Sequence, residues 1–159
     1  MPVFSVRLCN DRLTYSAVHF IILPNGTCEP AHGHNFRVAA ELSGPLDPFH
    51  CVIDFVALER MLQAILAELD HAVLLPSESE LIHVETHETE VEVTSEGRRW
   101  VFPRSECRLL PLASTTAERV AELIGLKLLR DLMAAGFAHP ERLRIELEES
   151  PGRLAICEF

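Results

Sequence analysis

Several stretches of the chain alternate between apolar and polar residues, and a period of two is typical of β-strands. The N-terminal stretch VFSVRL alternates in this way. In HGHNFRVAAEL, every second residue from His32 to Leu42 falls on the same face, and the turn-forming segment SGPLDP follows. The pattern therefore predicts strands over residues 3–8 and 32–42.

Two longer stretches have apolar residues three and four positions apart, which predicts amphipathic helices. The first is expected over residues 54–71, with Asp54 as its N-cap. The second is expected in STTAERVAELIGLKLLRDLMAAG, where Thr115 and Glu118 fit a capping box and Gly136 fits a C-terminal stop. The apolar positions expected to face the core from the first helix are Phe55, Leu58, Leu62, Ile65 and Leu69.

The period of two returns in two later segments, each interrupted by turn residues. Residues 88–103, ETEVEVTSEGRRWVFP, are expected to form a hairpin that turns near Gly97. RLRIELEES and RLAICEF, joined by a Pro-Gly pair, are expected to form a second hairpin at the C-terminus. The order strands, helix, hairpin, helix, hairpin predicts the α+β class with a mainly antiparallel sheet rather than a doubly wound one.

Composition narrows the class of protein further. A length of 159 residues fits one domain, residues 1–159, and 48% hydrophobic with 24% charged residues is typical of a globular chain. The formal net charge of −10 argues against nucleic acid as a partner. No apolar run reaches the roughly 18 residues of a membrane span. The N-terminus lacks a basic segment followed by an apolar one, so we expect no signal peptide, no membrane contact and a cytoplasmic location.

The stretch CEPAHGHNF, residues 28–36, carries the strongest candidate chemistry. A period of two places His32 and His34 on the same side of a strand, next to an apolar face. Zinc accepts neutral imidazole, and a catalytic zinc usually has three protein ligands and one open position. His19, in the apolar-flanked segment YSAVHF, is the best-placed third ligand. The alternative is that these are hydrogen-bonded structural histidines on an edge strand.

Two further positions near these histidines offer acid–base chemistry. Cys28 precedes His32 by four residues, and a thiol near a bound cation tends to lose its proton and can act as a general base. Its alternative is a small buried hydrophobic residue. Asp70 lies beside His71 and can orient its imidazole, although a histidine is also favoured at the end of a helix by the dipole.

Together these motifs resemble the 6-pyruvoyl-tetrahydropterin synthase / 6-carboxy-tetrahydropterin synthase family. The matching motifs, in chain order, are a histidine in YSAVHF, then C-x3-HGHN, VIDF, LDH, TAE and EES. The resemblance implies zinc held by His19, His32 and His34, and a proton-abstracting thiolate at Cys28. The other residues implied are the proton-shuttling pair Asp70 and His71, the pterin anchor Glu149, and the pterin-pocket residues Thr116 and Glu118.

The resemblance also implies a fold, an assembly and a substrate. The family has the tunnelling fold, in which two helices cover one face of a four-stranded antiparallel sheet. Its subunits form a barrel-containing homo-oligomer, a hexamer, with sites between neighbours. Its substrate is 7,8-dihydroneopterin triphosphate, and zinc acts on it as a Lewis acid. Relative to compact members, this chain has an inserted hairpin at about residues 76–112, and Arg37 and Arg153 are candidates for binding the triphosphate.

The leading prediction is a zinc-dependent lyase that converts 7,8-dihydroneopterin triphosphate to 6-carboxy-5,6,7,8-tetrahydropterin, with two other products as alternatives. The three-residue gap between Cys28 and His32 resembles the lyase branch that makes 6-carboxy-5,6,7,8-tetrahydropterin in queuosine and deazapurine biosynthesis. The 6-pyruvoyl branch has a longer gap. Glu29, in E-x2-HGH, resembles a third branch, in which a glutamate acts and 6-hydroxymethyl-dihydropterin is made for folate. Alternatively, Glu29 is a solvated loop residue.

Two alternatives of other classes are open as well. A non-catalytic oligomer could keep Glu149 for binding a pterin or purine without turning it over. A structural zinc protein would need a fourth protein ligand, for which Cys28 is the candidate.

Overall fold

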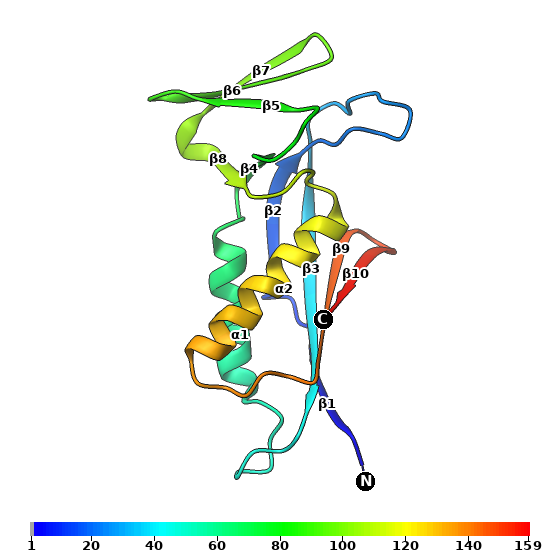
Figure 1. Cartoon of the computed structure of the whole chain (residues 1–159), viewed down its shortest axis with the longest axis vertical. Helices are drawn as coiled ribbons and strands as arrows, with labels where there is room; N and C mark the ends of the chain where they lie inside the picture. The colour runs from blue at the N-terminus through cyan, green and yellow to red at the C-terminus, as the bar shows by residue number, and fades with distance from the viewer. Residues whose placement is uncertain (1) are drawn as a thin grey trace.

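The structure, a computed structural model, describes residues 2–159. Its central element is a seven-stranded sheet in the order β10-β9-β3-β2-β4-β8, with β1 also paired to β3 (Figure 1). The longest strand, β3, links the two halves of this sheet, because it pairs with β2 over its first residues and with β1 and β9 over its last. The strands are β1 (Phe4–Leu8), β2 (Thr14–His19), β3 (His32–Gly44), β4 (Ala72–Pro76), β8 (Cys107–Leu110), β9 (Arg142–Ser150) and β10 (Arg153–Glu158).

The predicted fold class is confirmed, with one addition. Strands β1, β2, β3, β9 and β10 pair antiparallel, whereas β4 pairs parallel to β2 and β8 pairs parallel to β4. Neither β4 nor β8 was expected from the sequence. All five residues of β4, AVLLP, are buried, so the strand has no alternation that would reveal it.

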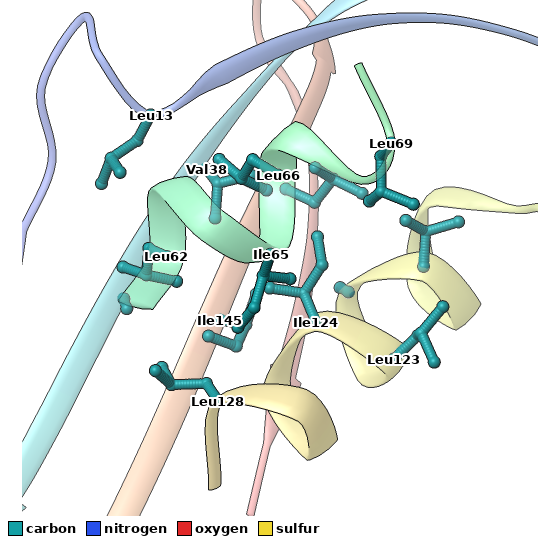
Figure 2. Packing of buried hydrophobic residues seen from close by; sticks show 14 of the residues in the cluster. Leu13, Val38, Leu62, Ile65, Leu66, Leu69, Leu123, Ile124, Leu128 and Ile145 are labelled. Atoms are coloured by element: carbon teal, nitrogen blue, oxygen red, sulfur yellow. The ribbon is translucent and has the colours of Figure 1, made fainter. Parts of the chain in front are cut away.

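Both helices cover one face of the sheet (Figure 1). They are α1 (Phe55–Ala67) and α2 (Ala117–Ala134). Figure 2 shows Leu62 and Ile65 of α1 meeting Ile124 and Leu128 of α2 above Ile145 of β9. This layer is the main hydrophobic core, and it holds the strands that carry the site residues in place.

Helix α1 begins as predicted and ends early. The Asp54 side chain accepts a hydrogen bond from the N–H of Val56, as expected of an N-cap. Phe55, expected on the core face, is half exposed in the first turn. The helix ends at Ala67, and residues 68–71, expected within it, form turns that lead into β4.

The predicted capping box of α2 is wrong by one residue. Thr116 is the N-cap, and its side chain accepts a hydrogen bond from the N–H of Arg119 at 3.4 Å. Thr115 cannot cap the helix because it is buried, with its hydroxyl donating to the carbonyl oxygen of Phe20. Gly136 ends the helical segment as predicted, in the left-handed conformation that favours glycine, with φ of 81°.

Residues between β4 and β8 form a separate three-stranded sheet of β5 (His83–Thr86), β6 (Glu90–Ser95) and β7 (Arg98–Pro103), followed by the 3₁₀ turn η1 (Arg104–Glu106). In Figure 1 this sheet lies at the end of the molecule away from the N-terminus. Strands β6 and β7 turn at Glu96–Gly97, where the sequence predicts a turn. A second apolar cluster beneath this sheet consists of Phe20, Cys28, Val73, Leu75, Ile82, Val91, Val93 and Cys107.

Within residues 2–159, no helix is both long and apolar enough to cross a membrane.

Candidate metal and pterin site

The three histidines expected to bind zinc lie together at the end of β2 and the start of β3. Antiparallel pairing places His19 opposite His32, and Ala17 opposite His34, so all three side chains lie on the same face of the sheet. One nitrogen from each ring lies within 4.8 Å of the others. Their arrangement can hold one metal ion.

Hydrogen bonds fix the orientation of two of these rings. Nδ1 of His19 lies 2.8 Å from the carbonyl oxygen of Thr115, and Nδ1 of His32 lies 2.9 Å from that of Pro30. A carbonyl oxygen only accepts, so each Nδ1 carries the proton and each Nε2 has a free lone pair. Backbone partners of this kind commonly orient metal-binding histidines.

The chemical environment suits a zinc ion. Nε2 of His19 is buried and has no hydrogen-bond partner, although a Glu149 oxygen lies 3.2 Å away. Burial lowers the pKa of His34, which favours the neutral imidazole that binds metal. Three clustered imidazoles, one of them with a buried nitrogen that has no hydrogen-bond partner, fit a catalytic zinc site.

Glu149 joins this cluster from β9. Its Oε1 lies 3.2 Å from Nε2 of His19 and 3.5 Å from Nε2 of His34. Beside it is a cavity of about 320 Å³, and the predicted pocket residues Thr116 and Glu118 line that cavity together with His19, Glu149 and Arg153. The structure therefore brings the predicted metal ligands and the predicted pterin-binding residues to one place. Arg37, the other candidate for the triphosphate, lines a different cavity, with Arg7 and Glu146.

Cys28 and Glu29 have different surroundings. The Cys28 side chain is fully buried in the second apolar cluster, and this burial raises the pKa of its thiol. Among the described residues, the group that could hold a metal contains the three histidines and not Cys28, so a closed site with a fourth thiolate ligand is not formed. Glu29 instead places its Oε2 4.0 Å from Nδ1 of His32 and accepts a hydrogen bond from the N–H of Ile21.

Asp70 and His71 form the predicted pair, on the other face of the sheet. Asp70 lies 2.9 Å from Nδ1 of His71 and accepts the N–H of Ser16 at 2.8 Å. The Ser16 bond, and then His71, lower the pKa of Asp70. His71 lines a cavity with Ser16 and Val18, which alternate along β2 with the residues of the histidine face. His34 also borders this cavity, but neither Asp70 nor His71 belongs to the group of side chains that could hold a metal.

Three residues that position the site had no functional signal in the sequence. The sequence predicts that the Thr115 hydroxyl caps a helix, but the carbonyl oxygen of Thr115 is the group that orients His19. Glu96 and Arg98 bind the backbone of Cys28 from the β6–β7 turn. Contacts made through backbone atoms, or by side chains 68 and 70 residues away, leave no local pattern.

The fold and the site define an α+β protein with three clustered histidines that could hold a metal ion, next to a carboxylate-lined cavity. The family model of 6-pyruvoyl tetrahydropterin synthase matches residues 9–158. The chain therefore belongs to the 6-pyruvoyl tetrahydropterin synthase family, whose members act on small-molecule pterins, and the predicted family is confirmed.

Individual relatives agree with this assignment. The chain is 29% identical over 142 residues to a Methanocaldococcus jannaschii protein provisionally named 6-carboxy-5,6,7,8-tetrahydropterin synthase, covering 89% of this chain and 86% of the relative. Among solved structures, 6-pyruvoyl tetrahydropterin synthase from Plasmodium falciparum has a TM-score of 0.89 and 26% identity, covering 99% of this chain and 98% of that one. The Plasmodium vivax enzyme has a TM-score of 0.93 at 22% identity, covering 100% and 99%.

Proposed function

We propose that the chain is a zinc-dependent pterin synthase that cleaves the side chain of 7,8-dihydroneopterin triphosphate with Glu29 as its base. One observation carries this proposal: the Glu29 carboxylate is partly exposed on the loop that leads into His32, 4.0 Å from its Nδ1, whereas the neighbouring thiol of Cys28 is buried in an apolar cluster. A base must reach the proton it removes, so geometry favours Glu29.

In this proposal the zinc ligands are His19, His32 and His34. When bound, zinc supplies Lewis acidity toward the oxygen atoms of the substrate side chain. Glu149 accepts parallel hydrogen bonds from the amino group and ring N–H of the pterin, a geometry that suits a carboxylate.

Other residues of the same cavity complete the binding site. Thr116 and Glu118 lie at the N-terminus of α2 and border the pterin. Arg153 is the basic residue that lines this cavity, so it is the better candidate for a contact to the triphosphate.

The proposed reaction is a retro-aldol cleavage. Glu29 removes the proton of the hydroxyl on the second side-chain carbon, and the bond between the first and second carbons breaks as that hydroxyl becomes an aldehyde. The electron pair moves into the ring imine, and a proton then adds to the first carbon. The products are 6-hydroxymethyl-7,8-dihydropterin and glycolaldehyde triphosphate.

Asp70 and His71 are proposed to supply the returning proton. Because the pair lies on the other face of the sheet in its own chain, it would serve the histidine cluster of a neighbouring subunit. This agrees with a homo-oligomer whose sites lie between subunits.

The solved relatives give further support. The Plasmodium vivax enzyme has been solved in variants that replace a catalytic glutamate by alanine and by cysteine. That description concerns the Plasmodium protein, and it shows that a glutamate can be a catalytic residue on this fold.

A second candidate is the 6-carboxy-5,6,7,8-tetrahydropterin reaction, with Cys28 as the base and with acetaldehyde and triphosphate released. The provisional names of four archaeal relatives favour it. It requires the Cys28 thiol to leave the apolar cluster, where its pKa is raised, and to turn toward the histidines.

Product identification separates these candidates. Zinc-loaded protein is incubated with 7,8-dihydroneopterin triphosphate, and the products are identified by mass spectrometry. We expect 6-hydroxymethyl-7,8-dihydropterin. A 6-carboxy product with acetaldehyde would shift the reaction to Cys28, and unchanged substrate bound at the site would indicate a non-catalytic pterin-binding oligomer.

A further inference from the structure

The turn between β6 and β7 reaches the loop that carries Cys28 and Glu29. The backbone N–H of Cys28 donates to Oε2 of Glu96 at 2.8 Å. Nη1 of Arg98 donates to the carbonyl oxygen of Cys28, also at 2.8 Å. Two side chains of the inserted sheet therefore bind both polar backbone groups of one residue. We refer to Glu96 and Arg98 as the Cys28 clamp.

These backbone groups need such partners. Residues 21–29 form a narrow hairpin. The N–H of Leu23 donates to the carbonyl oxygen of Thr27, and the N–H of Glu29 donates to that of Ile21. Between these two bonds, Ile22 lies opposite Cys28. In an antiparallel pair, the residues between two such bonds direct their own N–H and C=O groups outward. Cys28 is fully buried, so water cannot satisfy these groups, and without the clamp they would lack partners.

The turn itself has an unusual backbone. Glu96 has φ of 49° and Gly97 has φ of 76°, as in the two-residue turns that favour asparagine, aspartate or glycine. A glutamate is disfavoured in this conformation. The glutamate side chain is longer than that of aspartate or asparagine, and it reaches the N–H of Cys28. The residue with the disfavoured backbone conformation is therefore the one that contacts the loop.

The hairpin of residues 21–29 also sets the position of Glu29. The N–H of Glu29 donates to the carbonyl oxygen of Ile21 at 2.9 Å, and its carboxylate accepts the N–H of Ile21 at 3.2 Å. This leaves Oε2 at 4.0 Å from Nδ1 of His32. A shift of the hairpin would move the carboxylate relative to the histidine cluster.

We propose that Glu96 and Arg98 are positioning residues that lock the 21–29 hairpin and thereby hold the Glu29 carboxylate at the metal site. This inference rests on the proposed role of Glu29. The clamp contributes one negative and one positive charge, so it acts by fixing geometry and adds no net charge to the site. The inserted sheet is then part of the catalytic apparatus.

The first test measures steady-state kinetics on 7,8-dihydroneopterin triphosphate. We expect kcat to fall about tenfold or more in Glu96→Ala and Arg98→Met, because small displacements of a catalytic group are costly, with KM within about twofold. Glu96→Gln keeps an acceptor oxygen and retains most of kcat. The matched control is Arg99→Ala, whose side chain pairs with Glu92 at 2.6 Å on the exposed side of β7, and whose kcat stays unchanged.

The second test does not depend on activity. The alkylation rate of Cys28 by iodoacetamide is followed at the peptide level in folded, zinc-loaded protein. We expect alkylation about tenfold faster in Glu96→Ala and Arg98→Met than in wild type and Arg99→Ala, because the loop opens.

The two readouts separate the outcomes. Unchanged alkylation in the clamp variants overturns the clamp, whatever the activity. Faster alkylation with unchanged kcat overturns the positioning of Glu29. If wild-type protein turns over no substrate, the proposed function fails, while the alkylation rates still decide whether the clamp holds the loop. If Glu96→Ala does not fold, Arg98→Met alone gives the comparison with Arg99→Ala.

Discussion

At the scale of single residues, the site depends on which of two neighbouring side chains faces the histidines. Adjacent residues in extended backbone point to opposite sides. Here Glu29 lies 4.0 Å from Nδ1 of His32, and Cys28 lies in the apolar cluster under the three-stranded sheet. Burial raises the pKa of the Cys28 thiol, which disfavours the thiolate that a general base needs.

Removing one histidine should remove the metal. For His32→Ala we expect zinc content to fall from about one ion per chain to near zero, because a catalytic zinc has only three protein ligands. The measurement is metal analysis of the dialysed protein. His83→Ala, on exposed β5, is the control and should keep its zinc. Full zinc retention in His32→Ala would contradict the assigned ligand set.

The Asp70 carboxylate should stabilise the fold in a pH-dependent way. Its folded pKa is lowered, so its contribution is present above the unfolded value of about 3.9 and is lost as the pH falls below it. For Asp70→Ala we expect a loss of about 1 kcal/mol at pH 7, a modest value because the carboxylate is partly exposed. Urea unfolding at pH 7 and pH 3 measures this.

The difference between wild type and Asp70→Ala should be smaller at pH 3 than at pH 7. Asp11→Ala is the control, because the Asp11 side chain is 94% exposed, and it should change stability little at either pH. An equal loss at both pH values would show that the charge of Asp70 is not involved.

At this scale the sequence predicts residue types well and orientations poorly. The period of two places His32 and His34 together, the sequence also names His19 as the third ligand, and the structure places it opposite His32. The sequence could not determine whether Cys28 or Glu29 faces the metal site, because that depends on the hairpin of residues 21–29 and on the sheet that binds it.

At the scale of secondary structure, local signals locate the elements and tertiary contacts move their ends. Asp54 caps α1 as predicted, because the capping bond lies within the segment itself. The cap of α2 lies at Thr116 rather than Thr115, because Thr115 is buried against Phe20 and His19. Strands β4 and β8 escape prediction because both are short, β4 is buried throughout, and β8, at the edge of the sheet, does not alternate.

The cap of α1 offers a test of this local signal. Asp54→Ala removes the acceptor for the Val56 N–H and should lower the free energy of unfolding by about 1 kcal/mol. Asp54→Ser keeps an acceptor at the cap and should lose much less. Chemical denaturation measures both variants, and equal losses would contradict the capping role.

At the scale of the whole molecule, the position of Asp70 and His71 has a consequence for assembly. Asp70 and His71 lie outside the histidine cluster, and we propose that a complete site combines these groups from two copies of the chain. A mixture of Glu29→Ala and His71→Ala subunits, denatured and refolded together, should regain part of the activity that each variant lacks. No recovery from a mixed oligomer would place both groups in one subunit.

The most direct test of the central claim compares Glu29→Ala with Cys28→Ala in zinc-loaded protein. Each variant is assayed for kcat on 7,8-dihydroneopterin triphosphate, with zinc content and product measured in parallel. We predict that Glu29→Ala keeps its zinc and loses about a hundredfold or more in kcat, as expected for a general base. Cys28→Ala should keep its zinc and most of its kcat. Full activity in Glu29→Ala, together with loss of activity in Cys28→Ala, would contradict the assignment of Glu29 as the base.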